Sequence, residues 1–260
     1  MKDLIISDLH VGSYYGLMPE KVIVEDRTGQ RMIIKPNSTQ KAMLDYFNKM
    51  LKDVGPVDNL IVNGDICDGP QKKSMGKNVW TNDLYAQSKA AIELLSRIKA
   101  RHVYCTMGSE YHCMEDRPLE QYVAEQLKGE YGDDLIIEHE GLARFHVAHN
   151  VPVSSSSWQY RSTPIARDML LMAVNQANEE YGKIDLVVRS HAHYWVCVGL
   201  GHQWGLITPG WQVRTPFAVK RDMISSPDVG WVVVEIDDEG ELDISERHKH
   251  FGPCSRVVGR

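Results

Sequence analysis

Four short segments of the chain end in side chains that bind metal ions in many proteins, and each follows a run of apolar, mostly β-branched residues. The segments read LIISDLH, LIVNGDICDG, YCTMGSEYH and LVVRSHAH, and they supply Asp8, His10, Asp65, Asp68, Glu110, His112, His191 and His193. Buried strands that stop at one rim of an open sheet bring their ends together. Carboxylate and imidazole donors that converge at such a rim suit divalent ions. The pattern therefore predicts a catalytic metal site with room for two ions.

The spacing within these segments favours shared ligation. Asp8 and His10 are two residues apart, as are His191 and His193, so in an extended segment both members of a pair face the same side. His149 closes another apolar stretch, HVAHN, and adds a further strand-end donor. Each motif alone has an ordinary explanation, such as a solvated strand end. The combination of motifs is what indicates a site.

The two aspartates of the second segment are expected to differ in role. Asp65 follows Gly64, which permits a tight turn and close backbone approach, so its two carboxylate oxygens can reach two different ions. Asp68 is better placed to orient a ligand histidine than to bind metal. The alternative for both is an ordinary aspartate in a surface turn.

Composition and charge limit the class of protein. The chain has 260 residues, 43% of them hydrophobic and 25% charged, which fits one globular domain spanning 1–260. Its net charge of -6 argues against whole-molecule attraction to nucleic acid or anionic membranes, although a local basic channel remains open.

Cysteine usage and the apolar runs bear on the compartment. Five cysteines without a CxxC pair indicate reduced thiols. The first residues do not resemble a signal peptide, and no apolar run reaches the ~20 residues that a membrane crossing needs. We therefore expect a soluble, cytoplasmic protein without a membrane partner.

The expected elements alternate between strands and helices and then turn to hairpins. Strands are predicted at 3–7, 60–63, 102–107, 185–189, 194–199 and 204–208, helices at about 39–51, 84–99, 119–127 and 165–181, and hairpins at 135–149, 230–248 and, as an insertion, about 13–37. Early crossover units and late hairpins predict an α/β (mixed α+β) chain. Its two mixed β-sheets would pack as a sandwich flanked by helices.

Together the motifs resemble those of the calcineurin-like metallophosphoesterase superfamily. The match is ordered: D-x-H at Asp8, G-D-x-x-D at Asp65, a glycine-containing block at 108–112, the lone His149, and a G-H-x-H variant that begins at Ser190. The resemblance spans positions 8 to 193 and implies the four-layer architecture of that superfamily. It implies that Asp8, His10 and His193 bind one ion, that His149 and His191 bind the other, and that Asp65 bridges them.

The third block departs from the family pattern, which has Asn followed by His. Here the residues are Gly108-Ser109-Glu110-Tyr111-His112. We interpret Glu110 as the ligand in place of the Asn, and His112 as the catalytic histidine. A carboxylate is a sound oxygen ligand for such ions. His112 could instead be a structural core histidine.

The resemblance implies hydrolysis of a phosphoester by direct attack of a metal-bound hydroxide, without a phosphoenzyme. Two divalent ions are expected, Mn²⁺ first, with Zn²⁺, Fe or Ni²⁺ behind it. The substrate expected is a phosphodiester of a nucleotide or nucleic acid. The alternatives are a phosphomonoesterase and a binding protein that keeps the fold with weak or no catalysis.

Three further residues were considered for substrate binding because they follow the ligand motifs along the chain. Arg161 lies after His149, and Trp211 and Arg214 lie after His193. An arginine can contact a phosphate and an aromatic ring can stack on a base. The loops also resemble those of phage or prophage members of the superfamily. The alternative for each residue is an ordinary surface or turn position.

Overall fold

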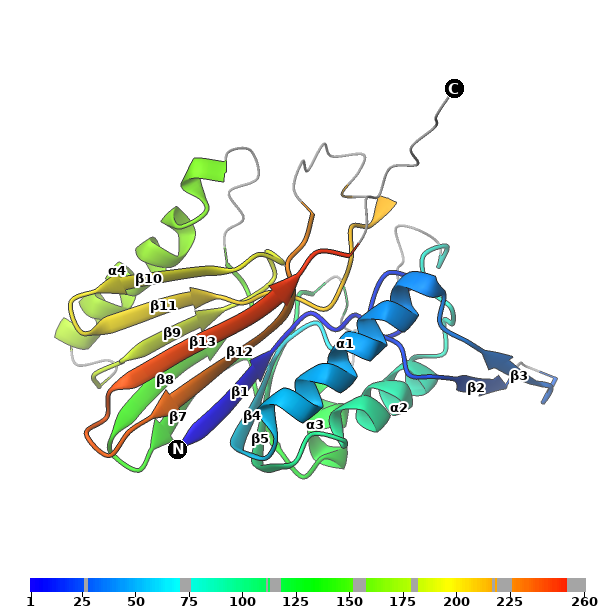
Figure 1. Cartoon of the computed structure of the whole chain (residues 1–260), viewed down its shortest axis with the longest axis horizontal. Coiled ribbons are helices and arrows are strands. Elements are labelled where there is room, and N and C mark those ends of the chain that lie inside the picture. Colours follow the sequence, from blue (N-terminus) through cyan, green and yellow to red (C-terminus); the bar gives the residue numbers. More distant parts are fainter. Residues whose placement is uncertain are drawn as a thin grey trace.

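Two mixed β-sheets lie face to face at the centre of the fold (Figure 1). The computed structural model describes residues 1–25, 28–70, 76–110, 112, 118–151, 158–178, 182–216, 218 and 226–251. The six-stranded sheet has the order β13-β12-β1-β4-β5-β6, and the five-stranded sheet has the order β10-β11-β9-β8-β7.

In each sheet, the strands that lead into the candidate site residues run parallel to one another. The first sheet contains β1 (Lys2–Ile6), β4 (Val57–Asn63), β5 (Ala100–Thr106), β6 (Glu130–Gly132), β12 (Val229–Ile236) and β13 (Leu242–Lys249). The second contains β7 (Asp134–His139), β8 (Ala143–Ala148), β9 (Leu186–Arg189), β10 (Val196–Leu200) and β11 (Gln203–Ile207). β1, β4, β5 and β6 are parallel neighbours, as are β8, β9 and β11, whereas the remaining strands pair antiparallel.

Helices cover the outer faces of the two sheets and complete four layers. α1 (Ser38–Val54), α2 (Leu84–Leu95) and α3 (Leu119–Gln126) share one hydrophobic cluster with the six-stranded sheet. α4 (Thr163–Ala177) packs on the five-stranded sheet, and a 3-10 turn (Trp158–Tyr160) precedes it. The sandwich flanked by helices that the sequence predicts is therefore confirmed.

The alternation of side chains along the strands explains the layering. Successive residues of a strand point to opposite faces. Ile5 and Ile61 face the second sheet and pack in one cluster with Phe145. Their neighbours Leu4 and Leu60 face the helices instead. Both faces of the central strands β1 and β12 are buried, which is why these strands are mostly apolar, whereas the edge strand β13 alternates between polar and apolar residues.

Helix α1 begins one residue earlier than the predicted 39, because its cap is Asn37. The Asn37 side chain accepts a hydrogen bond from the Gln40 backbone N–H at 2.9 Å, and the Gln40 side chain accepts one from the Asn37 N–H at 3.2 Å. This reciprocal capping box satisfies two of the N–H groups that a helix start leaves unpaired.

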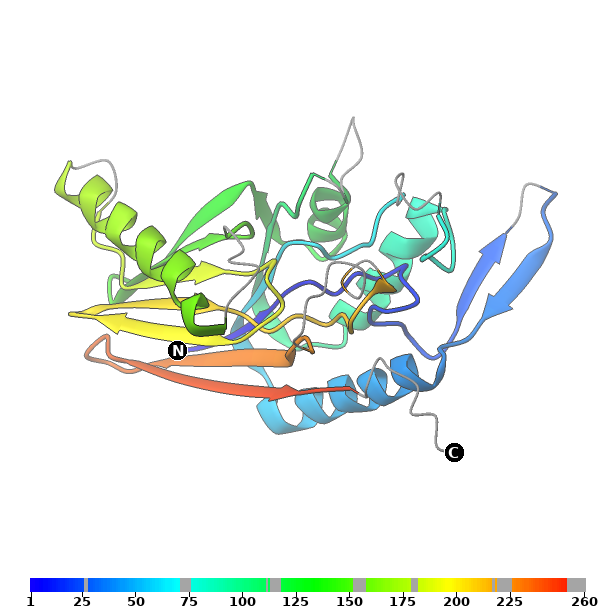
Figure 2. The ribbon, with the colours of Figure 1, turned by 90° about the horizontal axis from the view of Figure 1, so that it is seen from above.

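The hairpin expected within 13–37 is present as β2 (Val22–Glu25) and β3 (Arg31–Ile34), which pair antiparallel. It projects away from the two sheets (Figures 1 and 2). The strand β6 was not predicted, because three residues are too few for a periodic pattern. Within the part of the chain that the structure describes, no helix has the length and apolar character needed to cross a membrane.

Candidate metal centre

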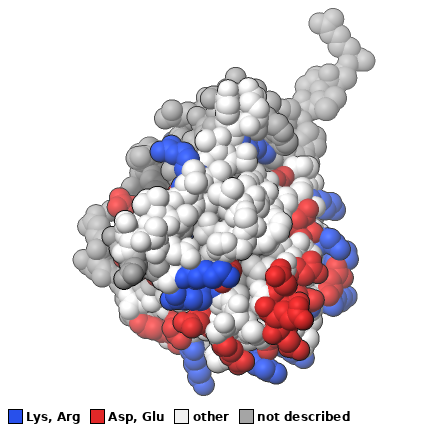
Figure 3. Space-filling model, turned by 90° about the vertical axis from the view of Figure 1, so that its left-hand side faces the viewer, with Lys and Arg blue, Asp and Glu red and all other residues white. Residues whose placement is uncertain are grey.

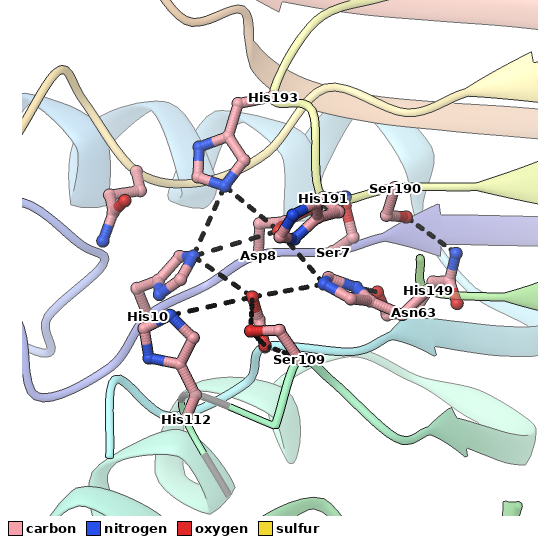
Figure 4. Close-up of polar contacts among 12 residues, drawn as sticks. Ser7, Asp8, His10, Asn63, Ser109, His112, His149, Ser190, His191 and His193 are labelled. Atoms are coloured by element: carbon pink, nitrogen blue, oxygen red, sulfur yellow. Dashed lines mark hydrogen bonds and ion pairs between the residues drawn. The ribbon is translucent and has the colours of Figure 1, made fainter. Parts of the chain in front are cut away.

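Five parallel strands, from both sheets, end at the same rim and deliver the metal-binding side chains there (Figure 4). β1 is followed by Asp8 and His10, and β4 by Asp65. β5 leads to the third block, β8 to His149, and β9 to His191 and His193. Backbone hydrogen bonds join neighbouring strand ends, for example within the six-stranded sheet from the Asp8 N–H to the Gly64 carbonyl at 3.1 Å. The strand ends that the apolar runs predict therefore do lie together at one rim.

The donors fall into two triads that meet at Asp65. In the first, of Asp8, His10 and His193, the Asp8 Oδ1 lies 3.1 Å from His193 Nε2 and the His10 and His193 Nε2 atoms are 3.4 Å apart. In the second, of Asp65, His149 and His191, Asp65 Oδ2 lies 3.2 Å from His149 Nε2. Asp65 Oδ2 is also 3.8 Å from His10 Nε2, so this one carboxylate faces both triads.

Three histidines are held in the orientation that a metal ligand needs. The Nδ1 atoms of His10 and His149 lie 3.0 Å from Asp68 Oδ1 and 2.8 Å from the Asn63 carbonyl oxygen. His112 Nδ1 lies 2.6 Å from the Asp68 carbonyl oxygen. Because these oxygens only accept, each Nδ1 carries the hydrogen and each Nε2 is left with a lone pair. Asp68 thus lies beside His10, where the sequence suggested an orienting residue.

The backbone at the rim adopts a conformation that side chains other than glycine rarely take. Within the described chain, seven non-glycine residues have positive φ, and five of them are triad residues: Asp8, His10, Asp65, His191 and His193. A residue other than glycine in the left-handed backbone conformation lowers the stability of the fold by about 1–3 kcal/mol. Such strain concentrates at functional sites, where the surrounding structure holds it in place.

Glycines make the close approaches in this cluster sterically feasible. A Cβ added at Gly64 would lie 2.4 Å from His149 Nδ1, and one at Gly108 would lie 2.3 Å from Asp65 Oδ1. A Cβ added at Gly210 would lie 3.0 Å from Asp8 Cβ and 3.2 Å from His193 Cγ. All four distances are shorter than ordinary van der Waals contact, so a larger residue at any of the three glycines would displace a donor.

Charges within the cluster shift the pKa values in two directions. Burial alone would raise the pKa of Asp8 and Asp65, but the facing histidines outweigh it, and both pKa values lie below the ordinary range. Burial would lower the pKa of His149, yet Asp65 and Asp8 raise it to about 10, and they raise the pKa of His193 as well. Burial dominates for His10 and His191 and lowers their pKa. Without bound metal, the cluster therefore holds protons on His149 and His193, at the positions where metal ions would bind.

The donors that are present fit divalent ions. Asp8 Oδ1 and His149 Nε2 are buried, and neither makes a hydrogen bond. A buried polar atom without a partner costs free energy, and a cation among these oxygens and nitrogens would satisfy both. The mixed carboxylate and imidazole set suits first-row transition ions such as Mn²⁺ or Zn²⁺.

The third block contributes a different residue from the one predicted. Glu110 is exposed and belongs to none of the donor groups within the described chain, so its interpretation as a ligand needs correction. Ser109 lies there instead, and its N–H and Oγ donate to Asp65 Oδ1 at 2.7 Å and 3.1 Å. His112 does reach the cluster, with Nε2 at 3.9 Å from Asp65 Oδ2. β5 ends at Thr106, and the loop that follows brings Ser109 to Asp65 and leaves the Glu110 side chain in solvent.

A chain of buried hydrogen bonds below the rim was not anticipated. Ser7 Oγ donates to Asp8 Oδ2 at 2.7 Å and lies 2.8 Å from Thr208 Oγ1, which lies 2.7 Å from Ser190 Oγ. Ser190 Oγ in turn accepts from Asn63 Nδ2 at 2.7 Å. The sequence did carry a signal, because Ser7 and Ser190 are polar residues directly before a ligand at the end of an apolar strand. The network connects the two sheets beneath the donors.

The three residues considered for substrate binding differ in their surroundings. Trp211 is fully buried, stacked on Trp231 with ring centroids 6.4 Å apart, so the expectation that it borders a substrate is wrong. Its role is structural, since its backbone N–H donates to the Asp8 carbonyl at 2.9 Å. Arg161 is partly exposed and lies over the Tyr194 ring at 4.5 Å, and Arg214 is partly exposed.

The architecture and the order of the donors along the chain are now both defined. Two mixed sheets, flanked by helices, carry Asp8, His10, Asp65, His149, His191 and His193 in sequence order at one rim. Two mixed sheets packed face to face, with helices on their outer faces, agree with the architecture that the motif resemblance implies. The candidate metal-binding edge is the rim where the strand ends of both sheets meet.

Comparison with known proteins gives likeness in structure only, because no family model and no curated protein matches the sequence. The chain is similar to a Vps29 mutant from Entamoeba histolytica (14% identity, 96% of this chain and 100% of that one, TM-score 0.46). It is also similar to an archaeal phosphodiesterase (12% identity, 96% of this chain and 100% of that one, TM-score 0.49). A third similar structure is a predicted phosphoesterase from Streptococcus pneumoniae (11% identity, 95% of this chain and 97% of that one, TM-score 0.40). With TM-scores below 0.5, these likenesses carry no argument about activity, which must come from the site.

Proposed function

We propose that the protein is a dinuclear metal-dependent phosphodiesterase that hydrolyses phosphoesters of nucleotides or nucleic acids. The observation that supports this most is the position of Asp65. Its Oδ2 lies 3.2 Å from a nitrogen of the second triad and 3.8 Å from one of the first. A carboxylate shared by two ions is the arrangement that two-metal hydrolysis of phosphoesters requires.

Two divalent ions bound in these triads would supply positive charge to the phosphate oxygens and would activate water, and we favour Mn²⁺. The residues of the chain hold this arrangement together. Asp68 and the Asn63 carbonyl fix the rings of His10 and His149, and Ser109 fixes one oxygen of Asp65. Each donor is therefore ordered before any ligand binds.

His112 is suited to proton transfer. Its Nδ1–H donates to the Asp68 carbonyl at 2.6 Å, which directs Nε2 toward the rim. When the ring is in its imidazolium form, Nε2 carries a proton as well, and this proton could pass to the leaving alkoxide when the phosphoester bond breaks, a contribution of about 10²–10⁴-fold. The ring is also 4.7 Å from the His10 ring, close to the first triad.

The surface charge bears on the kind of phosphodiester. On the face shown in Figure 3, Asp and Glu side chains gather in the lower part with Lys and Arg among them. The described residues of this face thus form no continuous basic surface for a duplex. We favour a small diester or a strand end, because the net charge of -6 argues against attraction of the whole molecule to nucleic acid.

Turnover of two simple esters tests the proposal. With added Mn²⁺, bis-p-nitrophenyl phosphate should be hydrolysed faster than p-nitrophenyl phosphate. Asp65→Asn should lower turnover by at least about 10²-fold, because both ions lose a shared ligand. Asp45→Asn, an exposed change on α1, serves as the control and should retain activity.

Other outcomes would favour the alternatives. Faster turnover of the monoester would indicate a phosphomonoesterase. The observation that favours a binding protein is the third block, where a serine hydroxyl stands beside Asp65 and Glu110 is exposed. Lack of turnover by the wild type over a broad ester panel would support that reading and contradict an enzyme.

A further inference from the structure

A separate group of metal-binding side chains lies where β12 and β13 meet, outside the two triads. Asp228 directly precedes β12, His248 lies near the end of β13, and His250 follows it. Val229 pairs with Lys249 in the antiparallel ladder, which brings Asp228 beside His250. One donor atom of each residue lies within 4.8 Å of the others. The histidines are two residues apart and so extend from the same side of the strand.

The carboxylate of Asp228 is fixed with one oxygen free for a cation. Its Oδ2 accepts the Trp195 N–H at 2.7 Å. Its Oδ1 lies 3.5 Å from His250 Nδ1 and 3.9 Å from His248 Nε2. His250 Nδ1 also lies 3.2 Å from the Pro227 carbonyl oxygen, so an ion bound at Nδ1 would replace this hydrogen bond and the ring would carry its hydrogen on Nε2. Asp228 is only 7% exposed, so this oxygen is largely withdrawn from water. A buried carboxylate facing two imidazoles is a setting in which a bound cation is stabilising.

A second carboxylate orients one of the histidines. His248 Nδ1 lies 3.2 Å from Glu246 Oε2. Because the carboxylate can only accept, Nδ1 carries the hydrogen and Nε2, the atom that faces Asp228, keeps its lone pair. A carboxylate behind a ligand histidine is the usual support of a zinc site.

These donors border a pocket. It has a volume of about 350 Å³ and is lined by Asp228, His248, His250, Arg161 and Trp195, among others. Three protein donors beside open space leave room for a fourth ligand such as water. Two carboxylates, of Asp228 and Glu246, outnumber the single guanidinium of Arg161, so the surrounding charge favours a cation.

We propose that Asp228, His248 and His250 bind one further divalent transition-metal ion, with Zn²⁺ as the preferred species. Two histidines, one carboxylate and an open position form a donor set that zinc accepts. The Asp228 N–H donates to the His193 carbonyl at 2.9 Å. An ion here would therefore tie the end of β13 to the segment that carries a ligand of the first triad.

Zinc counting tests the site directly. The full-length protein and the double variant His248→Ala/His250→Ala are dialysed against the same buffered Zn²⁺, and bound zinc is measured by mass spectrometry. The wild type should hold one equivalent more than the double variant. His102→Ala removes an exposed histidine on β5 and should bind as much zinc as the wild type.

A second variant and a second measurement guard against misfolding. Asp228→Asn keeps an oxygen for the Trp195 N–H and removes the charge, so it should lose the same equivalent with an unchanged circular dichroism spectrum. In hydrogen exchange, Zn²⁺ should slow the Trp195 and Asp228 amides of the wild type and leave them unchanged in the double variant. Equal zinc content in the wild type and both variants, or equal exchange, would overturn the proposal.

Discussion

Gly64→Ala tests whether the second triad works as a unit. The change places a Cβ 2.4 Å from His149 Nδ1, and φ of +75° adds the left-handed cost. Gly141→Ala is the matched control, because its φ is +79° and nothing lies within 4 Å of the added atom. The two variants share the backbone effect and differ only in the contact with His149.

The size of the effect follows from these distances. Ordinary contact begins at 3.4 Å, so the His149 ring must move by about 1 Å. A metal site tolerates about 0.2 Å in a ligand distance, so we expect metal affinity at the second triad to fall about 10²-fold. The backbone cost of about 1–2 kcal/mol, common to both variants, should lower Tm by about 2–8 °C.

Calorimetric titration with Mn²⁺ measures the affinity, and thermal unfolding of the metal-free proteins measures the shared cost. Gly141→Ala should bind metal like the wild type. The reasoning is refuted if Gly64→Ala binds two ions with wild-type affinity, or if Gly141→Ala loses affinity to the same degree.

Three further outcomes follow from contacts described above. Asp68→Asn should weaken metal binding at the first triad by about 10–100-fold, because His10 loses its orienting carboxylate; unchanged titration curves would contradict this. Metal binding should release a proton from His149, whose pKa is raised to about 10 in the metal-free protein. Affinity should thus rise about tenfold per pH unit between pH 7 and 9, and calorimetry in buffers of different ionisation enthalpy would detect the proton or its absence. In the metal-free protein, the raised pKa of His149 also contributes to the free energy of unfolding. This contribution is fully present below pH 6.5 and is lost as the pH rises through about 10. Trp211→Ala should cost about 3–5 kcal/mol in denaturant unfolding, since the ring is fully buried; a loss under about 1 kcal/mol would show that its packing matters little.

Much of the site could be predicted because its ligands end apolar strands. The run before Asp8 and the run before His191 are buried strands, and parallel strands bring their carboxyl ends to one rim. Helix boundaries also agreed closely, although the capping residue of α1 depends on a contact between Asn37 and Gln40 that periodicity does not reveal.

The errors arose where a loop, and not a strand, decides the direction of a side chain. Whether Ser109 or Glu110 turns toward Asp65 depends on the path of the chain after β5, which hydrophobic patterns do not specify. Trp211 lies in a proline-containing loop that looks exposed in sequence. Contacts with Trp231 and Phe47, from distant parts of the chain, bury it.

The left-handed residues at the rim have a consequence for how the protein would respond to removal of bound metal ions. Asp8, His10, Asp65, His191 and His193 each hold a backbone conformation that glycine would adopt more cheaply. At about 1 kcal/mol or more each, the five together approach the whole stability of a typical domain. Bound ions offset that cost locally. A chelator should therefore open the strand-end loops first, as one cooperative unit, while the two sheets beneath them stay folded.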